Sequence, residues 1–251
     1  MNKIRSTIFD ILQLLATALS VLVFMLVMPL PWWIMQSVVN GWARIVRFLA
    51  RYIMGIHVRV IGMENIPKGP IVIASKHQSA WDTSFFQTVF PRSVYIMKKE
   101  LLSIPVWGWV ARKVRSVAVD RAGGASALKA LISDTLARLE EGRAVVIFPE
   151  GTRMLPGAQI DFHPGVAAIY KSAGVPVVPV ALNSGLFWGR SNVGEKTPGT
   201  ITVEFLPAIA PGGDRKAFMK DLQTSINEAT ARLEAEASAE FSAVADVLAK
   251  P

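Results

Sequence analysis

The chain has 251 residues, of which 51% are hydrophobic, with a formal net charge of +8 and a pI of about 9.9. This length suits one globular domain with an appendage, and the mean hydropathy of +0.37 is too low for a protein with many membrane spans. The lack of cysteine excludes disulfides and thiolate nucleophiles, and three histidines make a zinc cage hard to assemble. The basic balance suits nucleic acid or an anionic lipid surface.

Residues 1–55 are expected to form a membrane-anchoring segment of two helices. Asp10 is the only charged residue within residues 6–43, and the apolar run at 11–28 approaches the length of a membrane-spanning helix. Two prolines then break the helix, and a second helical pattern covers residues 32–54. The segment therefore favours a membrane over nucleic acid, which would explain only the pI.

The arrangement of this segment is open at the sequence level. It is either a spanning helix followed by an interfacial helix or a hairpin that enters one leaflet and returns. Two buried core helices are a third option, and a cleaved signal peptide is disfavoured because the apolar run continues past Ala18. Basic residues flank both ends, which mildly favours the hairpin. With no disulfides, the segment indicates the inner (cytoplasmic) membrane, with the globular domain facing the cytoplasm.

Residues 56–251 are expected to form one α/β domain. A helical pattern at 125–141 ends at Gly142, and residues 214–249 suggest one or two surface helices. Near-continuous apolar strands separated by helices predict a mostly parallel central sheet covered by helices on both faces. The strand candidates are residues 57–62, 70–75, 93–97, 116–119, 144–148, 175–182 and 201–206.

Polar residues follow several of these strands abruptly, where open α/β sheets carry their sites. His77 and Asp82 lie five residues apart, a spacing that on a regular helix leaves about 140° between them. They can meet only if His77 lies in a loop and Asp82 on the first turn of the next helix. In that arrangement a carboxylate orients the imidazole, which becomes a general base. The alternative is a structural pairing at a helix start.

Cationic residues follow three other strands. After Phe148 the chain continues as Pro149-Glu150-Gly151-Thr152-Arg153, where the glycine permits a tight turn and the arginine suits phosphate. Lys98 and Arg121 follow two further expected strands. Each cation could be a solvated surface residue, but together they predict a site for an anionic substrate.

These motifs resemble the 1-acylglycerol-3-phosphate acyltransferase family, the lysophosphatidate acyltransferases, in its order and spacing from about residue 56 to 206. Residues 77–82 match its His-x4-Asp motif, and residues 119–121 look like its second block. Residues 148–153 match its third block in full, and residues 175–181 are similar to its proline-containing fourth block.

The resemblance implies a catalytic role for His77 as the base and for Asp82 as its orienting partner. It implies that the fourth block shapes the acyl-donor side, and that the acceptor-binding residues are Glu150, Gly151, Thr152 and Arg153, with Lys98 and Arg121 adding charge. Lys76 departs from the family, which usually has Asn there. His163 also departs, because it precedes Gly165 where a basic residue is more usual.

The implied reaction is direct acyl transfer from an acyl thioester, either acyl-CoA or acyl-ACP, to a lysophospholipid hydroxyl, with no metal and no cofactor. Backbone N–H groups near Gly151 are candidates for the oxyanion site. A lipase is disfavoured because the chain has no Gly-x-Ser-x-Gly motif, and nucleotide hydrolysis because it has no P-loop. Two alternatives stay open: an acyltransferase acting on another lyso-lipid, such as a lyso-aminolipid, and a non-catalytic lipid-binding protein. The aromatic residues that line an acyl tunnel or fill the core are Phe85, Phe86, Trp107 and Trp109.

Overall fold

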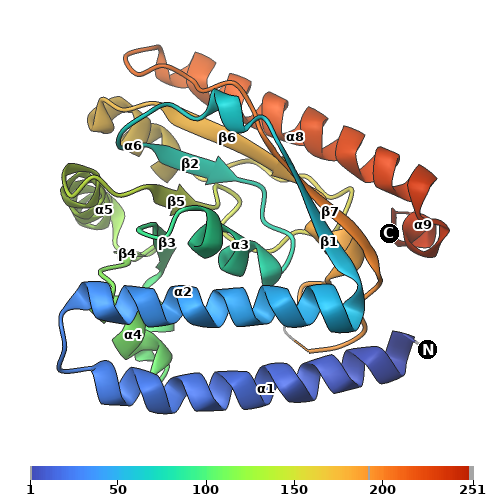
Figure 1. The fold of residues 1–251 in the computed structure, drawn as a ribbon. Coiled ribbons are helices and arrows are strands. Elements are labelled where there is room, and N and C mark those ends of the chain that lie inside the picture. Colours follow the sequence, from blue (N-terminus) through green and yellow to red (C-terminus); the bar gives the residue numbers. More distant parts are fainter. Residues whose placement is uncertain (1, 192, 249–251) are drawn as a thin grey trace.

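The computed structural model describes residues 2–191 and 193–248, which form a sheet of seven strands between layers of helices (Figure 1). All seven strands expected from the sequence form, with ends that differ by no more than two residues. The strands are β1 (Ile56–Ile61), β2 (Val72–Ser75), β3 (Val94–Lys98), β4 (Val117–Val119), β5 (Val145–Ile147), β6 (Val177–Leu182) and β7 (Gly199–Phe205).

The strand order across the sheet is β1-β7-β6-β2-β5-β3-β4. Every neighbouring pair is parallel except β6 and β7, which run antiparallel, with Ala181 opposite Glu204. The mostly parallel sheet predicted from the sequence is therefore confirmed. The carboxyl ends of the neighbouring parallel strands β2, β5, β3 and β4 lie at the same edge of the sheet, so the loops that follow them lie together.

Helices cover both faces of the sheet, as expected. Along β5, Val146 faces the hydrophobic cluster on the first face, and Val145 and Ile147 face the cluster on the opposite face, as the alternation of side chains in a strand requires. The helices of the first face include α3 (Trp81–Val89) and the N-terminal pair. The opposite face carries α5 (Gly124–Glu140), α6 (Gly165–Ala173) and α8 (Arg215–Glu240). The remaining short helices are η2 (Met63–Asn65), η3 (Lys99–Ser103), α4 (Trp107–Lys113), α7 (Ser184–Phe187) and α9 (Ser242–Leu248).

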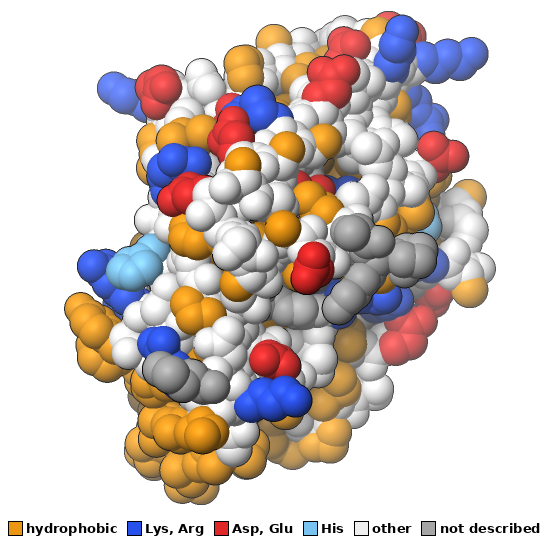
Figure 2. Space-filling model, turned by 90° about the vertical axis from the view of Figure 1, so that its right-hand side faces the viewer, with side chains coloured by type: hydrophobic (Ala, Val, Ile, Leu, Met, Phe, Trp, Pro, Cys, Tyr) orange, Lys and Arg blue, Asp and Glu red, His pale blue; other side chains and the backbone are white. Residues whose placement is uncertain are grey.

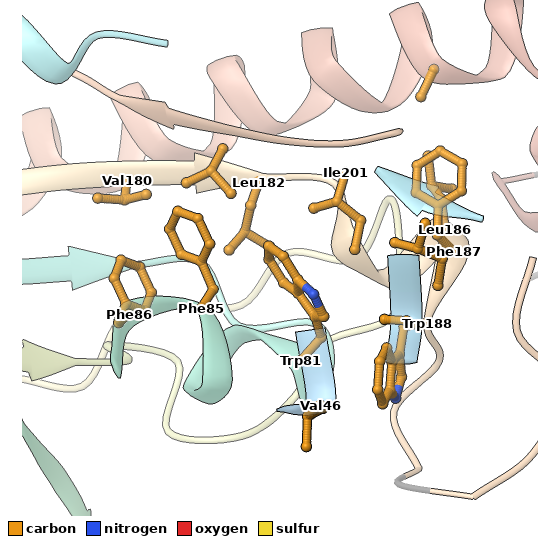
Figure 3. Close-up of a cluster of buried hydrophobic side chains, with 14 of the residues drawn as sticks. Val46, Trp81, Phe85, Phe86, Val180, Leu182, Leu186, Phe187, Trp188 and Ile201 are labelled. Carbon is orange, nitrogen blue, oxygen red and sulfur yellow. The ribbon is translucent and has the colours of Figure 1, made fainter. Parts of the chain in front are cut away.

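Aromatic side chains of α3 form much of the core on the first face (Figure 3). Phe85 and Phe86 are fully buried and lie against Val180 and Leu182 of β6. Both phenylalanines therefore fill the core. This packing fixes α3, and with it the first turn that carries Asp82, against the centre of the sheet.

The N-terminal segment forms two antiparallel helices, α1 (Asn2–Val27) and α2 (Trp32–Leu49), and α2 continues into a π-helical turn, η1 (Ala50–Met54) (Figure 1). Phe9, Met54 and Val46 belong to the same core cluster as the sheet. These helices are therefore packed onto the α/β domain. The helix breaks at residues 28–31, as the two prolines predicted, and the chain reverses there.

By length and composition, α1 is the one helix among the described residues that could cross a membrane. Only 11% of its most apolar window is buried. The exposed side chains of α1 include Leu15, Leu19, Leu22 and Leu26. Hydrophobic side chains gather at the bottom of the molecule in Figure 2, where Figure 1 places α1. An apolar surface of this extent favours association with a membrane.

Candidate active site

His77 lies in the loop between β2 and α3, and Asp82 lies on the first turn of α3. The distance from His77 Nδ1 to Asp82 Oδ2 is 2.8 Å. This is the arrangement that the five-residue spacing required. Because Nδ1 is hydrogen-bonded to a carboxylate, Nδ1 carries the ring proton, and Nε2 is the basic nitrogen of the ring.

Asp82 is fully buried and accepts from five donors. Oδ2 accepts from His77 and from the backbone N–H groups of Gln78 and Ser79, at 2.8 and 2.9 Å. Oδ1 lies 2.9 Å from the hydroxyl of Ser79 and 2.6 Å from that of Ser184. Burial alone would raise the pKa of Asp82, but the bonds from His77, Ser184 and Ser79 outweigh it and leave the pKa lowered. The carboxylate therefore stays ionised and able to stabilise an imidazolium.

The imidazole of His77 stacks on Phe148 at the end of β5, with ring centroids 3.9 Å apart and planes 16° apart. Its side chain is 11% exposed. The ring is thus held on one side by Asp82 and across its face by Phe148. Such a histidine can remove a proton from a substrate without changing its own position.

His77 faces a cavity of about 1280 Å³ whose wall is mostly apolar. Trp107 also lines it, which leaves Trp109, 45% exposed, outside both the cavity and the core. The cavity gathers most of the residues that the resemblance implicated in binding. These are Lys98, Arg121, Gly151, Thr152 and Arg153.

The turn after β5 places Gly151 against Arg121, one of these cations. Gly151 has a φ of +64°, and its carbonyl accepts from Arg121 Nη2 at 2.8 Å. A Cβ at this position would lie 2.0 Å from Arg121 Nη2 and 2.9 Å from His163 Cδ2. Only glycine gives the turn both its backbone angle and this close approach. The N–H of Gly151 donates to Phe148 O and is therefore not free to stabilise an oxyanion.

Glu150 belongs to the same turn but does not line the cavity. It is 1% exposed, and its Oε1 accepts from Lys76 Nζ at 2.5 Å while Oε2 accepts from the N–H of His77 at 3.0 Å. Burial raises the pKa of Glu150, and Lys76 and His77 partly offset that rise. In this structure Glu150 holds the His77 loop.

The proline-containing fourth block, residues 175–181, leads into and forms most of the buried strand β6, and it does not line the cavity. Among residues 2–191 and 193–248, no group of three His, Asp or Glu side chains could hold a metal.

Three further residues at the site belong to none of the sequence motifs and were not predicted. Ser184 bonds Asp82, and Arg190 lines the cavity beside Arg153, whose Nη1 donates to Arg190 O at 2.6 Å. Glu234 of α8 accepts from Gln78 Nε2 at 2.5 Å. Each lies more than 30 residues from its partner, so only the fold brings the pairs together.

The site combines a fixed imidazole with a large, mostly apolar cavity and nearby cations. This combination suits an acyltransferase. The family model described as Acyltransferase matches residues 57–183, and the chain belongs to this family.

Similar proteins carry a more specific name. A protein from Pseudomonas aeruginosa named 1-acyl-sn-glycerol-3-phosphate acyltransferase is 39% identical over 187 residues, covering 74% of this chain and 72% of that protein. A protein from Mus musculus named 1-acyl-sn-glycerol-3-phosphate acyltransferase alpha is 30% identical, covering 83% and 74%. The crystal structure of the 1-acyl-sn-glycerophosphate (LPA) acyltransferase PlsC from Thermotoga maritima has the same fold, with a TM-score of 0.72 at 21% identity over 94% of this chain and 98% of that one.

Proposed function

We propose that this protein transfers an acyl group from an acyl thioester to the free hydroxyl of 1-acylglycerol 3-phosphate, which makes phosphatidic acid. The observation that carries the proposal is the His77–Asp82 pair at the wall of a cavity that also presents Lys98, Arg121 and Arg153. The names of the similar proteins support the same substrate. The donor is an acyl-CoA or an acyl-ACP, because both present the same thioester.

The reaction uses His77 twice. Nε2 removes the proton of the acceptor hydroxyl as its oxygen attacks the thioester carbonyl. The tetrahedral intermediate then collapses, the carbon–sulfur bond breaks, and the thiolate takes the proton back from the imidazolium. Asp82 stabilises the imidazolium between these steps. General base catalysis of this kind contributes roughly 10²- to 10⁴-fold, and positioning in the cavity supplies much of the remainder.

The acceptor phosphate binds the cationic residues of the cavity, with Arg153 as its principal partner and Lys98 and Arg121 adding charge. Gly151 and Thr152 shape the turn that presents Arg153. Burial lowers the pKa of Arg153, but a guanidinium remains protonated at neutral pH. The apolar wall accommodates acyl chains.

The membrane supplies the lipid acceptor. The exposed apolar side chains of α1 contact the bilayer, and the antiparallel pairing of α1 and α2 suits a hairpin that enters one leaflet. In this arrangement the catalytic domain lies on the cytoplasmic face of the inner membrane, where acyl thioesters are made.

The test is acyl transfer from a labelled acyl thioester to 1-acylglycerol 3-phosphate, with monoacylglycerol as the phosphate-free acceptor. The intact protein should acylate the phosphate acceptor, and His77→Ala should lose turnover while it still binds the lipid. Transfer by His77→Ala above a few per cent would reject His77 as the base. Transfer to another lyso-lipid alone would retain this chemistry and reject the acceptor.

A further inference from the structure

The loop that follows α7 (residues 188–191 and 193–198) places a second arginine in the cavity. Arg190 and Arg153 both line the cavity that contains His77. Arg153 Nη1 donates to the backbone carbonyl of Arg190 at 2.6 Å, so the loop fixes where the Arg153 guanidinium lies. The family motifs end at β6 and do not include this loop.

Neither of the two guanidinium groups forms an ion pair with a carboxylate among the described residues. Burial lowers the pKa of Arg153, the Asp82 carboxylate opposes that effect, and the positive charge of Arg190 adds to it. Across residues 2–191 and 193–248, no ion pair within 4.0 Å involves either arginine. Two like charges that face one cavity repel each other until an anion lies between them. The pair is therefore suited to an anionic ligand.

The loop that carries Arg190 is fixed at both ends. Trp188 pairs with Lys196 in an isolated antiparallel bridge, and the Trp188 indole packs edge-on against Phe9 of α1 with ring centroids 5.1 Å apart. The buried Lys196 donates to Asp10 Oδ1 at 2.6 Å. Asp10 Oδ2 accepts from the N–H of Gly194 at 3.0 Å. Because the loop is held at both ends, its backbone loses little conformational entropy when a ligand binds Arg190.

We propose that Arg190 is the second guanidinium of a phosphate-binding pair, and that it makes the site selective for phosphomonoesters over phosphodiesters. The inference rests on the proposed function and extends it. A phosphomonoester carries a charge of about −1.5 to −2 at pH 7 and three terminal oxygens, because its second pKa is about 6. A phosphodiester carries a single charge and two such oxygens. Arg153 satisfies the single charge of the diester, whereas Arg190, which lies next to Arg153, provides a hydrogen-bonding partner for the second charge of the monoester. Lys98 and Arg121 add charge without distinguishing the two ligands.

The experiment measures the binding of two unreactive ligands, dodecyl phosphate and dodecyl methyl phosphate, which differ by one methyl group and one ionisable proton. They are titrated in detergent micelles against the intact protein and against Arg190→Ala, Arg190→Lys and Arg215→Ala. Arg215 begins α8, is exposed and does not line the cavity, so its variant removes an equal charge elsewhere. Thermal unfolding of each variant shows that it is folded.

The intact protein should bind the monoester at least about tenfold more tightly than the diester. Arg190→Ala should weaken the monoester roughly ten- to a hundredfold and the diester by less than about threefold, since hydrogen bonds between charged groups contribute most of the difference. Arg190→Lys should retain part of the preference, and Arg215→Ala all of it.

An unchanged preference in Arg190→Ala would overturn the inference, as would an equal loss for both ligands. Acylation of 1-acylglycerol 3-phosphate by the intact protein is assayed in parallel. Without that acylation the proposed function fails, whereas a preference that still depends on Arg190 would leave the phosphomonoester site standing.

Discussion

The residues on both sides of His77 are held by buried carboxylates. Lys76, 2% exposed, pairs with Glu150, which also accepts the N–H of His77. Gln78 donates to Glu234 of α8 at 2.5 Å, and Glu234 also accepts from the N–H of Gly157 at 3.0 Å. Buried charges cost free energy even when they are paired. Here the buried carboxylates fix the backbone of the loop that carries His77. This positioning accounts for their presence despite the unfavourable free energy of burial.

Glu234 should make the stability of the protein depend on pH. Burial raises its pKa, and the bonds from Gln78 and Gly157 only partly offset that rise. A carboxyl with a raised folded-state pKa contributes its full stability below the unfolded value of about 4.3, and that contribution is lost as the pH rises through the folded value. Gln does not titrate. The unfolding midpoint of the wild type minus that of Glu234→Gln should therefore fall as the pH rises from about 4 to 8.

The control for this titration is Glu228→Gln, an exposed carboxyl on the same helix. Its midpoint should differ from the wild type by a nearly constant amount over the same range. A difference between the wild type and Glu234→Gln that grows with pH would contradict a raised pKa for Glu234.

Gly151→Ala should impair acceptor binding more than it impairs folding. Its φ of +64° costs an alanine about 1–2 kcal/mol, and the new methyl group would displace the Arg121 guanidinium. We expect KM for 1-acylglycerol 3-phosphate to rise about tenfold. Gly174→Ala is the matched control, because φ there is +61° and no atom lies within 4 Å of the added Cβ. It should lose similar stability with unchanged KM, and equal KM values for both variants would reject a binding role for this turn.

Contacts between residues close in the chain were predictable at this scale, and the others were not. The bond between His77 and Asp82 followed from their spacing and the position of a helix start. Nothing local indicates that Gln78 meets Glu234, or that Glu150 turns away from the cavity towards Lys76. These contacts depend on where α8 and the turn after β5 pack, which a residue pattern does not contain.

At the scale of elements, apolar runs bounded by glycine, proline or charged residues predicted all seven strands. Of these, β2, β5, β6 and β7 are largely buried, and β1, β3 and β4 only partly. The C-terminal helices were expected as well, and Asp214 caps α8 by accepting the N–H groups of Lys216 and Ala217 at 2.9 Å. The direction of β7 was not predictable, because reversing a strand leaves its apolar pattern unchanged. The domain boundary near residue 55 stays a prediction.

Among the polar contacts that attach α1 is an ion pair at its single internal charge. Asp10 is the only charged residue between residues 6 and 43, and it pairs with Lys196, which is 1% exposed. The Lys196 ammonium also lies 4.9 Å from the centre of the Phe9 ring and 5.0 Å from that of Trp188. The charge that interrupts the apolar helix thus has a structural role inside the molecule.

Asp10→Asn should lower the free energy of unfolding by about 3–5 kcal/mol, because it leaves the Lys196 ammonium buried without its counter-ion. Replacing both residues, as Asp10→Asn with Lys196→Met, should cost less than the sum of the two single changes. Chemical denaturation of the three variants measures this coupling. Additive losses would show that the two charges do not interact in solution.

At the scale of the whole molecule, the apolar surface of α1 lies along the bottom in Figure 2, while charged side chains are scattered over the rest of that view. Leu15 and Leu19 are 60% and 64% exposed on this surface. A water-soluble protein gains nothing from exposing them, whereas each leucine contributes about 1.5–3 kcal/mol when it is buried in an apolar phase. We infer that this surface, more than the net charge of +8, keeps the protein at a bilayer.

Replacing Leu15 and Leu19 by Gln should therefore reduce partitioning into neutral phospholipid vesicles at least about a hundredfold. Met63→Gln, a change at a residue 48% exposed in η2, should leave partitioning unaltered. Because neither leucine is in the core, the double variant should unfold near the wild-type temperature. It should also acylate a short-chain lysophosphatidate in free solution, and lose activity only when the acceptor is held in vesicles. Undiminished partitioning would instead place the membrane contact on another surface of the molecule.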